Sequence, residues 1–205
     1  MQIGVLSLNQ KSTRWSRYGG YVFEILAHAG FPYLKTTPEA LQALIHPKNV
    51  DMFVRNGVFT EHELHSRYEI LLENYSKHIN IEALTMIDMV NKQVVPAVIG
   101  YQNELAELIL RKKTVNADIE TSLEENLLKK ISKLSANLET KLNDLVGQVL
   151  AVREIKDNHA LAVAYREQVF TAMSELRQIV DELETLTSSK HWPIPTYSEI
   201  LNSVI

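Results

Sequence analysis

A long, narrow line of apolar residues constrains the fold of this 205-residue chain more than any other feature. Between residues 119 and 152, leucine, isoleucine and valine recur at steps of three and four, which is the spacing of one face of an α-helix. The line consists of Ile119, Leu123, Leu127, Ile131, Leu134, Leu138, Leu142, Leu145, Val149 and Val152. We expect one helix here, capped by Asn116 or Asp118, and a second helix that covers the line.

A suitable partner helix follows in the chain. Apolar residues again recur at steps of three and four between Leu161 and Leu186, and Asp157 with Asn158 offers a turn between the two runs. Two long antiparallel helices joined by a short turn are therefore predicted. The spacing leaves open whether these helices pair within one chain or between chains.

Three helix starts can be read from residues that satisfy free backbone N–H groups. Thr37 precedes a proline and a glutamate, an order typical of a helix N-terminus. Thr60 and Glu63 form a capping box, in which each side chain accepts a hydrogen bond from the backbone of the other residue. Thr196 and Glu199 repeat this pattern, which predicts a last short helix.

The helical pattern between these starts has marked interruptions. The pair Asn56-Gly57 ends a short helical stretch, because glycine adopts positive φ angles readily. We expect Asn80 to restart a helix and Pro96 to kink or interrupt it, since proline lacks a backbone N–H. The apolar spacing places Leu71 and Leu84 on the buried side.

The N-terminal segment differs from the rest of the chain. Residues 3–8 form a short apolar run typical of a strand, and residues 21–29 have helical spacing, so residues 1–32 are predicted to form a short βα segment. The predicted fold class is mainly α, a helical bundle with a long antiparallel hairpin. The predicted divisions are residues 1–32, a helical region over 33–112, and the hairpin with a C-terminal tail over 113–205.

Composition excludes several classes of protein. The absence of cysteine excludes disulfide scaffolds, thiol nucleophiles and thiolate metal sites. A net charge of −4 and a pI near 6.0 give no sign of nucleic-acid binding. The longest uncharged apolar stretch, residues 94–101, is far shorter than the ~20 residues of a membrane span. We therefore expect a cytoplasmic protein that binds neither nucleic acid nor membrane.

Residue patterns that carry catalysis are scarce. The sequence contains no glycine-rich phosphate loop, dinucleotide fingerprint, nucleophile elbow or calcium-binding loop, so we assign no catalytic, cofactor-binding or metal-binding residue. One alternative stays open, a small metal- or ligand-binding protein that uses His62, His65 and Glu69, which fall at helical steps of three and four. The competing interpretation is a solvent-facing first helical turn, where acidic residues favour the positive end of the helix.

Trp192 stands beside a proline-rich tail and has two interpretations. It is either a plug in the core of its own chain or an anchor at an interface. The sequence favours neither.

Six blocks of sequence form a recognisable set. They are Leu34–Leu41, Gly57–Ile70, Glu73–Tyr75, Ile79–Met89, Pro96–Val98 and Trp192–Tyr197. The set resembles the C-terminal region of type III glutamine synthetases over about residues 33–205, whereas residues 1–32 depart from that family.

The resemblance implies a helical C-terminal domain that serves packing and oligomer assembly. Enzymes of that family join ammonia to glutamate with ATP and divalent Mg or Mn ions, and they assemble as large double rings. Their catalytic region precedes the matched part, so the resemblance implies no catalytic site and no cofactor on this chain. It also implies an upstream catalytic domain, identical subunits, or both as partners. A coiled-coil adaptor for an unrelated protein is a further alternative.

Overall fold

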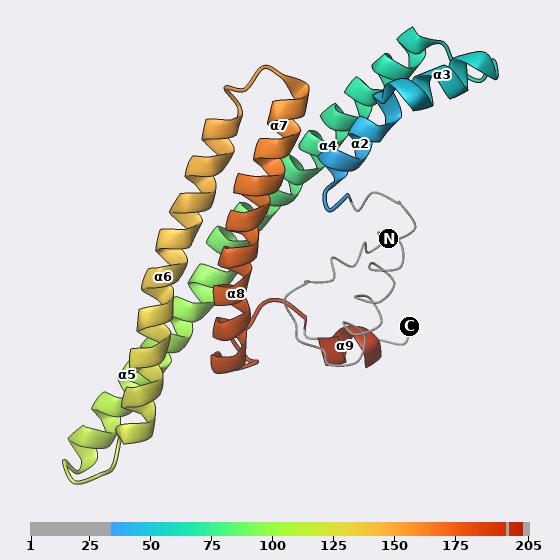
Figure 1. Ribbon diagram of the computed structural model, residues 1–205. Helices are drawn as coiled ribbons and strands as arrows, with labels where there is room; N and C mark the ends of the chain where they lie inside the picture. The colour runs from blue at the N-terminus through green and yellow to red at the C-terminus, as the bar shows by residue number, and fades with distance from the viewer. Residues whose placement is uncertain (1–33, 196, 203–205) are drawn as a thin grey trace, which may run out of the picture.

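Helices make up nearly all of the computed structural model, which describes residues 34–195 and 197–202 (Figure 1). No strand occurs among these residues, and the prediction of a mainly α fold is confirmed. The βα segment predicted for residues 1–32 and the capping residue Thr196 lie outside the described residues. None of the helices described is long and apolar enough to cross a membrane.

One continuous helical rod runs along the whole molecule (Figure 1). It consists of α4 (Glu61–Met89), the π-helical turn η2 (Val90–Val94) and α5 (Val95–Val115), and it is roughly 80 Å long at 1.5 Å per residue. The restart predicted at Asn80 is wrong. Ile79 and Ala83 near Asn80 are buried in the core, and the Asn80 side-chain oxygen accepts a hydrogen bond of 3.2 Å from the Tyr165 hydroxyl, so tertiary contacts keep the helix intact.

The interruption predicted at Pro96 is present as a wider helical turn. The π-helical η2 precedes α5, and Pro96 occupies the second position of α5. Proline offers no N–H to the carbonyl of Lys92, and its ring would crowd that carbonyl in a regular α-helix. Val90, Val94 and Val98 are all buried. In a regular α-helix, side chains four residues apart point in directions that differ by about 40°, and the wider π turn reduces this drift away from the core.

The long apolar line packs as a helical hairpin within the chain. Its first arm is α6 (Ser122–Val152), and its second arm consists of α7 (Asn158–Ala164), the π-helical turn η3 (Tyr165–Val169) and α8 (Phe170–Leu186). The two arms run antiparallel, with α6 packed against both α8 and α5 (Figure 1). The predicted hairpin is confirmed, and its helices pair within one chain.

The first arm begins later than predicted. Its N-cap is Thr121, rather than Asn116 or Asp118. Asn116 instead closes the preceding turn, where its side-chain oxygen accepts a 3.0 Å hydrogen bond from the backbone N–H of Asp118. Leu123 is 78% exposed, so the apolar line joins the core only from Leu127 onward.

Short helices lie beside the start of the rod. They are α2 (Thr37–Gln42), the 3₁₀ turn η1 (Ala43–Ile45) and α3 (Pro47–Arg55). Thr36 caps α2 in place of the predicted Thr37, because only Thr36 has Glu39 three positions later to complete a capping box. The capping box of Thr60 and Glu63 starts α4 as predicted.

One apolar core joins the rod to the hairpin. Its fully buried members come from both units and include Ala83, Val94, Ile131, Leu145 and Leu176. A smaller cluster lies between α4 and α7 and consists of Tyr68, Leu72 and Ala162. The core draws on residues on both sides of position 112, and the division into 33–112 and 113–205 stays a prediction.

Candidate assembly surface

The three residues considered for metal binding lie in the first turns of α4. His62, His65 and Glu69 are all exposed to solvent. The Glu69 carboxylate accepts a hydrogen bond of 2.7 Å from the side-chain amide of Asn158 at the start of α7. Within residues 34–195 and 197–202, no three His, Asp or Glu side chains lie together as a metal-ligand set. The described structure therefore does not arrange His62, His65 and Glu69 as a set of metal ligands.

The neighbouring Glu63 fixes the start of the rod. Its carboxylate accepts a hydrogen bond of 2.8 Å from the backbone N–H of Thr60, and the Thr60 hydroxyl accepts one of 3.2 Å from the backbone N–H of Glu63. The hydrogen bonds from the Thr60 backbone and then from its hydroxyl lower the pKa of Glu63. Glu63 is thus a structural carboxylate in its charged form at neutral pH.

A stripe of exposed residues runs along α4, opposite the residues that α4 buries. We define this α4 outer stripe by its members, which are Ile70, Glu73, Asn74, Lys77, Ile81 and Leu84. Ile70 is 54% exposed, Ile81 is 59% exposed and Leu84 is 42% exposed. Ile70 and Ile81 are close to three helical turns apart, so they lie almost in line along the helix. An apolar line on the solvent side marks a candidate contact surface.

The middle of the stripe carries balanced charge. The Lys77 ammonium lies 2.6 Å from the Glu73 carboxylate, in an i, i+4 pair whose side chains are more than half exposed. Asn74 lies beside this pair and is exposed. The stripe therefore consists of two apolar ends separated by a polar centre whose charges cancel.

The apolar spacing of the sequence does not predict this stripe, because it places Leu71 and Leu84 on the buried side of the helix. Leu71 is 43% exposed and Leu84 is 42% exposed, so that placement is wrong. The available signal was the pair Ile70 and Ile81, which share a helix face with Glu73 and Lys77 rather than with the buried leucines.

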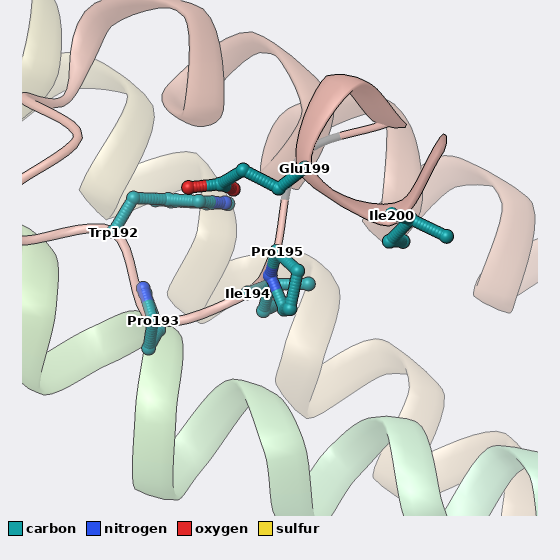
Figure 2. A pocket seen from close by; sticks show the side chains of 6 residues that line it. All are labelled: Trp192, Pro193, Ile194, Pro195, Glu199 and Ile200. Atoms are coloured by element: carbon teal, nitrogen blue, oxygen red, sulfur yellow. The ribbon is translucent and has the colours of Figure 1, made fainter. Parts of the chain in front are cut away.

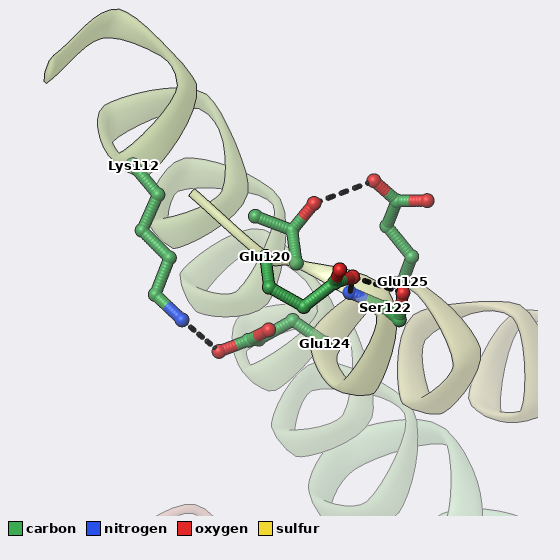
Figure 3. A network of polar contacts seen from close by, with 6 residues as sticks. Lys112, Glu120, Ser122, Glu124 and Glu125 are labelled. Atoms are coloured by element: carbon green, nitrogen blue, oxygen red, sulfur yellow. Dashed lines mark hydrogen bonds and ion pairs between the residues drawn. The ribbon is translucent and has the colours of Figure 1, made fainter. Parts of the chain in front are cut away.

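A polar network closes the end of the molecule where α5 turns into α6 (Figure 3). The Lys112 ammonium pairs with the Glu124 carboxylate, and Lys113 pairs with Glu125 at 2.6 Å. The Thr121 hydroxyl donates a 2.8 Å hydrogen bond to Glu125. Hydrogen bonds from the two lysines lower the pKa of both carboxyl groups. The network fastens the end of α5 to the first turn of α6.

The segment after α8 folds back onto α5. The Nε2 atom of His191 lies 2.5 Å from a carboxylate oxygen of Glu104, and the Nζ atom of Lys190 lies 3.8 Å from the same oxygen. The hydrogen bond from His191 and the charge of Lys190 lower the pKa of Glu104. These contacts fix the direction in which the chain leaves the bundle.

Trp192 packs against the core of its own chain, as a plug would. Its indole nitrogen is buried and has no hydrogen-bond partner among the described residues. Trp192 borders an open hollow of about 480 Å³ beside α9 (Tyr197–Asn202) (Figure 2). The hollow is lined by Trp192, Pro193, Ile194, Pro195, Glu199 and Ile200.

Comparison with known proteins gives a consistent set of similarities. Residues 23–113 match the family described as the glutamine synthetase C-terminal domain. The match begins ten residues before the start predicted from sequence, so residues 23–32 are part of the likeness. It extends through α2, α3 and α4 into α5 and includes the whole α4 outer stripe.

Longer proteins show the same likeness. A glutamine synthetase of Butyrivibrio fibrisolvens is 37% identical over 181 residues, which cover 88% of this chain and 26% of that protein. A type-3 glutamine synthetase of Dictyostelium discoideum is 32% identical over 188 residues, which cover 90% of this chain and 26% of that protein. A glutamine synthetase of Bacteroides fragilis is 28% identical over 179 residues. The chain spans about a quarter of the length of these curated relatives.

Proposed function

We propose that this chain, which belongs to the glutamine synthetase family as its C-terminal domain, serves as a helical assembly domain. In this role it packs on the catalytic region of a glutamine synthetase or on identical subunits, and it does not carry out the reaction itself. The observation that carries the proposal is the α4 outer stripe, because it lies within the family match and presents isoleucine and leucine side chains to solvent.

The reaction proposed for the whole protein is the ATP-dependent ligation of ammonia to glutamate. That reaction passes through a phosphorylated glutamate, so it needs divalent ions held by several oxygen ligands against a triphosphate. We assign ATP and Mg or Mn ions to the catalytic region, and we expect no contribution to their binding from His62, His65 or Glu69. The family match also supports the cytoplasm as the proposed compartment.

The proposal is tested by mixing the 205-residue chain with a glutamine synthetase catalytic region that lacks its C-terminal domain. We expect sedimentation velocity to show association, and Ile81→Asp to weaken it. Leu150→Asp is the matched control, because Leu150 is similarly exposed, at 56%, but lies on α6. Phosphate release by the chain alone with ATP, magnesium, glutamate and ammonium would contradict the assignment of catalysis to another region. A chain that associates neither with the catalytic region nor with itself would contradict the assembly role.

A further inference from the structure

We propose that the α4 outer stripe pairs with the same stripe of a second copy of this chain, antiparallel and about a two-fold axis close to Asn74 and Lys77. This inference deepens the proposed function and rests on it, because it names a second copy as the partner at the assembly surface.

The apolar residues of the stripe are spaced for self-pairing. An antiparallel copy centred between residues 75 and 76 places Ile70 of one chain opposite Ile81 of the other, and the two-fold axis repeats the contact. The two isoleucines are 54% and 59% exposed, so both have apolar surface left to bury. Because they are almost three full turns apart, both contacts fall on one line of the helix. Both isoleucine contacts of this two-fold pair therefore come from the stripe itself.

The charges in the centre select this orientation. In the antiparallel arrangement, Asn74 of one copy lies opposite Lys77 of the other, and each Glu73 approaches the Lys77 of the second copy as well as its own, 2.6 Å away. The four charges then alternate and sum to zero. A parallel arrangement in register would place lysine against lysine and glutamate against glutamate, which is repulsive. A shifted antiparallel register centred on Lys77 would remove the axial offset of about 4.5 Å between the two lysines and place them directly opposite each other.

The ends of the stripe are compatible with the same register. Leu84 of one copy lies opposite Arg67 of the other. The Arg67 guanidinium group lies 4.5 Å from the centre of the Phe59 ring, so the aliphatic part of the arginine side chain is available to cover the leucine. Glu63 and Asp88 also fall opposite each other. Two features limit the repulsion between these carboxylates. Glu63 already has Thr60 as a partner and Asp88 has Lys92, and crossing helices diverge toward their ends.

The absence of cysteine from the sequence allows a direct test of register. Ile70→Cys and Ile81→Cys chains are purified separately and oxidised alone and as a mixture. In the proposed pair, residues 70 and 81 of opposite copies are in disulfide range, whereas residue 70 is roughly 16 Å along the axis from residue 70 of the second copy. We expect the mixture to form mostly the 70–81 cross-link and each variant alone to form little. Asn74→Cys should link to itself, because the axial offset is only about 4.5 Å.

Glu139→Cys lies at an exposed position on α6 and gives the rate of cross-linking by random collision. Preferential self-linking of Ile70→Cys would overturn the antiparallel orientation, and cross-linking no faster than that of Glu139→Cys would overturn the pairing altogether. As an independent readout, we expect Ile81→Asp to weaken dimerisation roughly a hundred-fold in sedimentation equilibrium, since two-fold symmetry introduces the charge twice. Leu150→Asp should leave the dimer unchanged. If Ile81→Asp instead abolishes association with the catalytic region while the 70–81 link never forms, the proposed function stands and this inference fails.

Discussion

Replacing Leu145 by alanine tests whether the apolar line of α6 holds the rod and the hairpin together. Leu145 is fully buried in the common core. The change removes three carbon atoms, worth about 2.4 kcal/mol at ~0.8 kcal/mol per buried methylene, and it leaves a cavity that adds to the loss. We expect the free energy of unfolding to fall by about 3–4 kcal/mol and Tm to fall by roughly 6–16 °C for a chain of this size.

The matched control for Leu145 is Leu150→Ala, five residues further along the same helix. Leu150 is 56% exposed, and leucine and alanine have similar helix propensities, so we expect a loss below about 0.5 kcal/mol. Urea unfolding followed by far-UV circular dichroism measures both variants. Equal losses for the two variants, or a loss below about 1 kcal/mol for Leu145→Ala, would show that this line is not the central contact of the fold.

Further predictions concern polar contacts. Thr60→Ala should lower the free energy of unfolding by about 1 kcal/mol in urea titration, because the first turn of the rod loses its N-cap. Tyr165→Phe should cost about 1 kcal/mol through the lost hydrogen bond to Asn80, and a double-mutant cycle with Asn80→Ala should show that the two losses are not additive. The pKa of Glu125 is lowered by the Lys113 hydrogen bond, so its contribution to stability is present above the ordinary carboxyl pKa of 4.5 and is lost as the pH falls through the lowered value. Glu125→Gln should therefore lower Tm at neutral pH, and its difference from the unmodified chain should shrink as the pH falls below 4.5.

These polar predictions have separate controls. Thr140→Ala is the control for Thr60→Ala, because Thr140 lies inside α6 and caps no helix. It should leave stability within about 0.5 kcal/mol. A pH-independent Tm difference for Glu125→Gln would contradict an ionic role for Glu125, and additive losses at Asn80 and Tyr165 would contradict their coupling.

Local signals in the sequence predicted one helix start and one helix end correctly. The capping box of Thr60 and Glu63 is present because both partners lie within one turn of each other. Gly57 ends its helix at φ +62°, the conformation that favours glycine there. The predicted cap of α2 was Thr37, whereas the observed cap is Thr36. Glu39 lies three positions after Thr36 and completes a capping box with Thr36 alone.

The errors arose where distant residues decide the outcome. Asn80 resembles a helix start, but it is held inside α4 by Tyr165, which is 85 positions away in the sequence. The exposure of Leu84 depends on where α6, α7 and α8 pack around the rod, and apolar spacing alone could not supply that. The fold class and the hairpin were therefore predictable, whereas the α4 outer stripe required the structure.

The role of the α4 outer stripe in assembly can be measured in a whole glutamine synthetase that contains this chain. Ile81→Asp and the control Leu150→Asp are introduced separately, and each protein is followed by sedimentation velocity. We expect the Ile81 variant to separate into smaller particles at unchanged Tm and the Leu150 variant to remain assembled. An Ile81 variant that sediments like the unmodified protein would contradict the assignment of the α4 outer stripe to assembly.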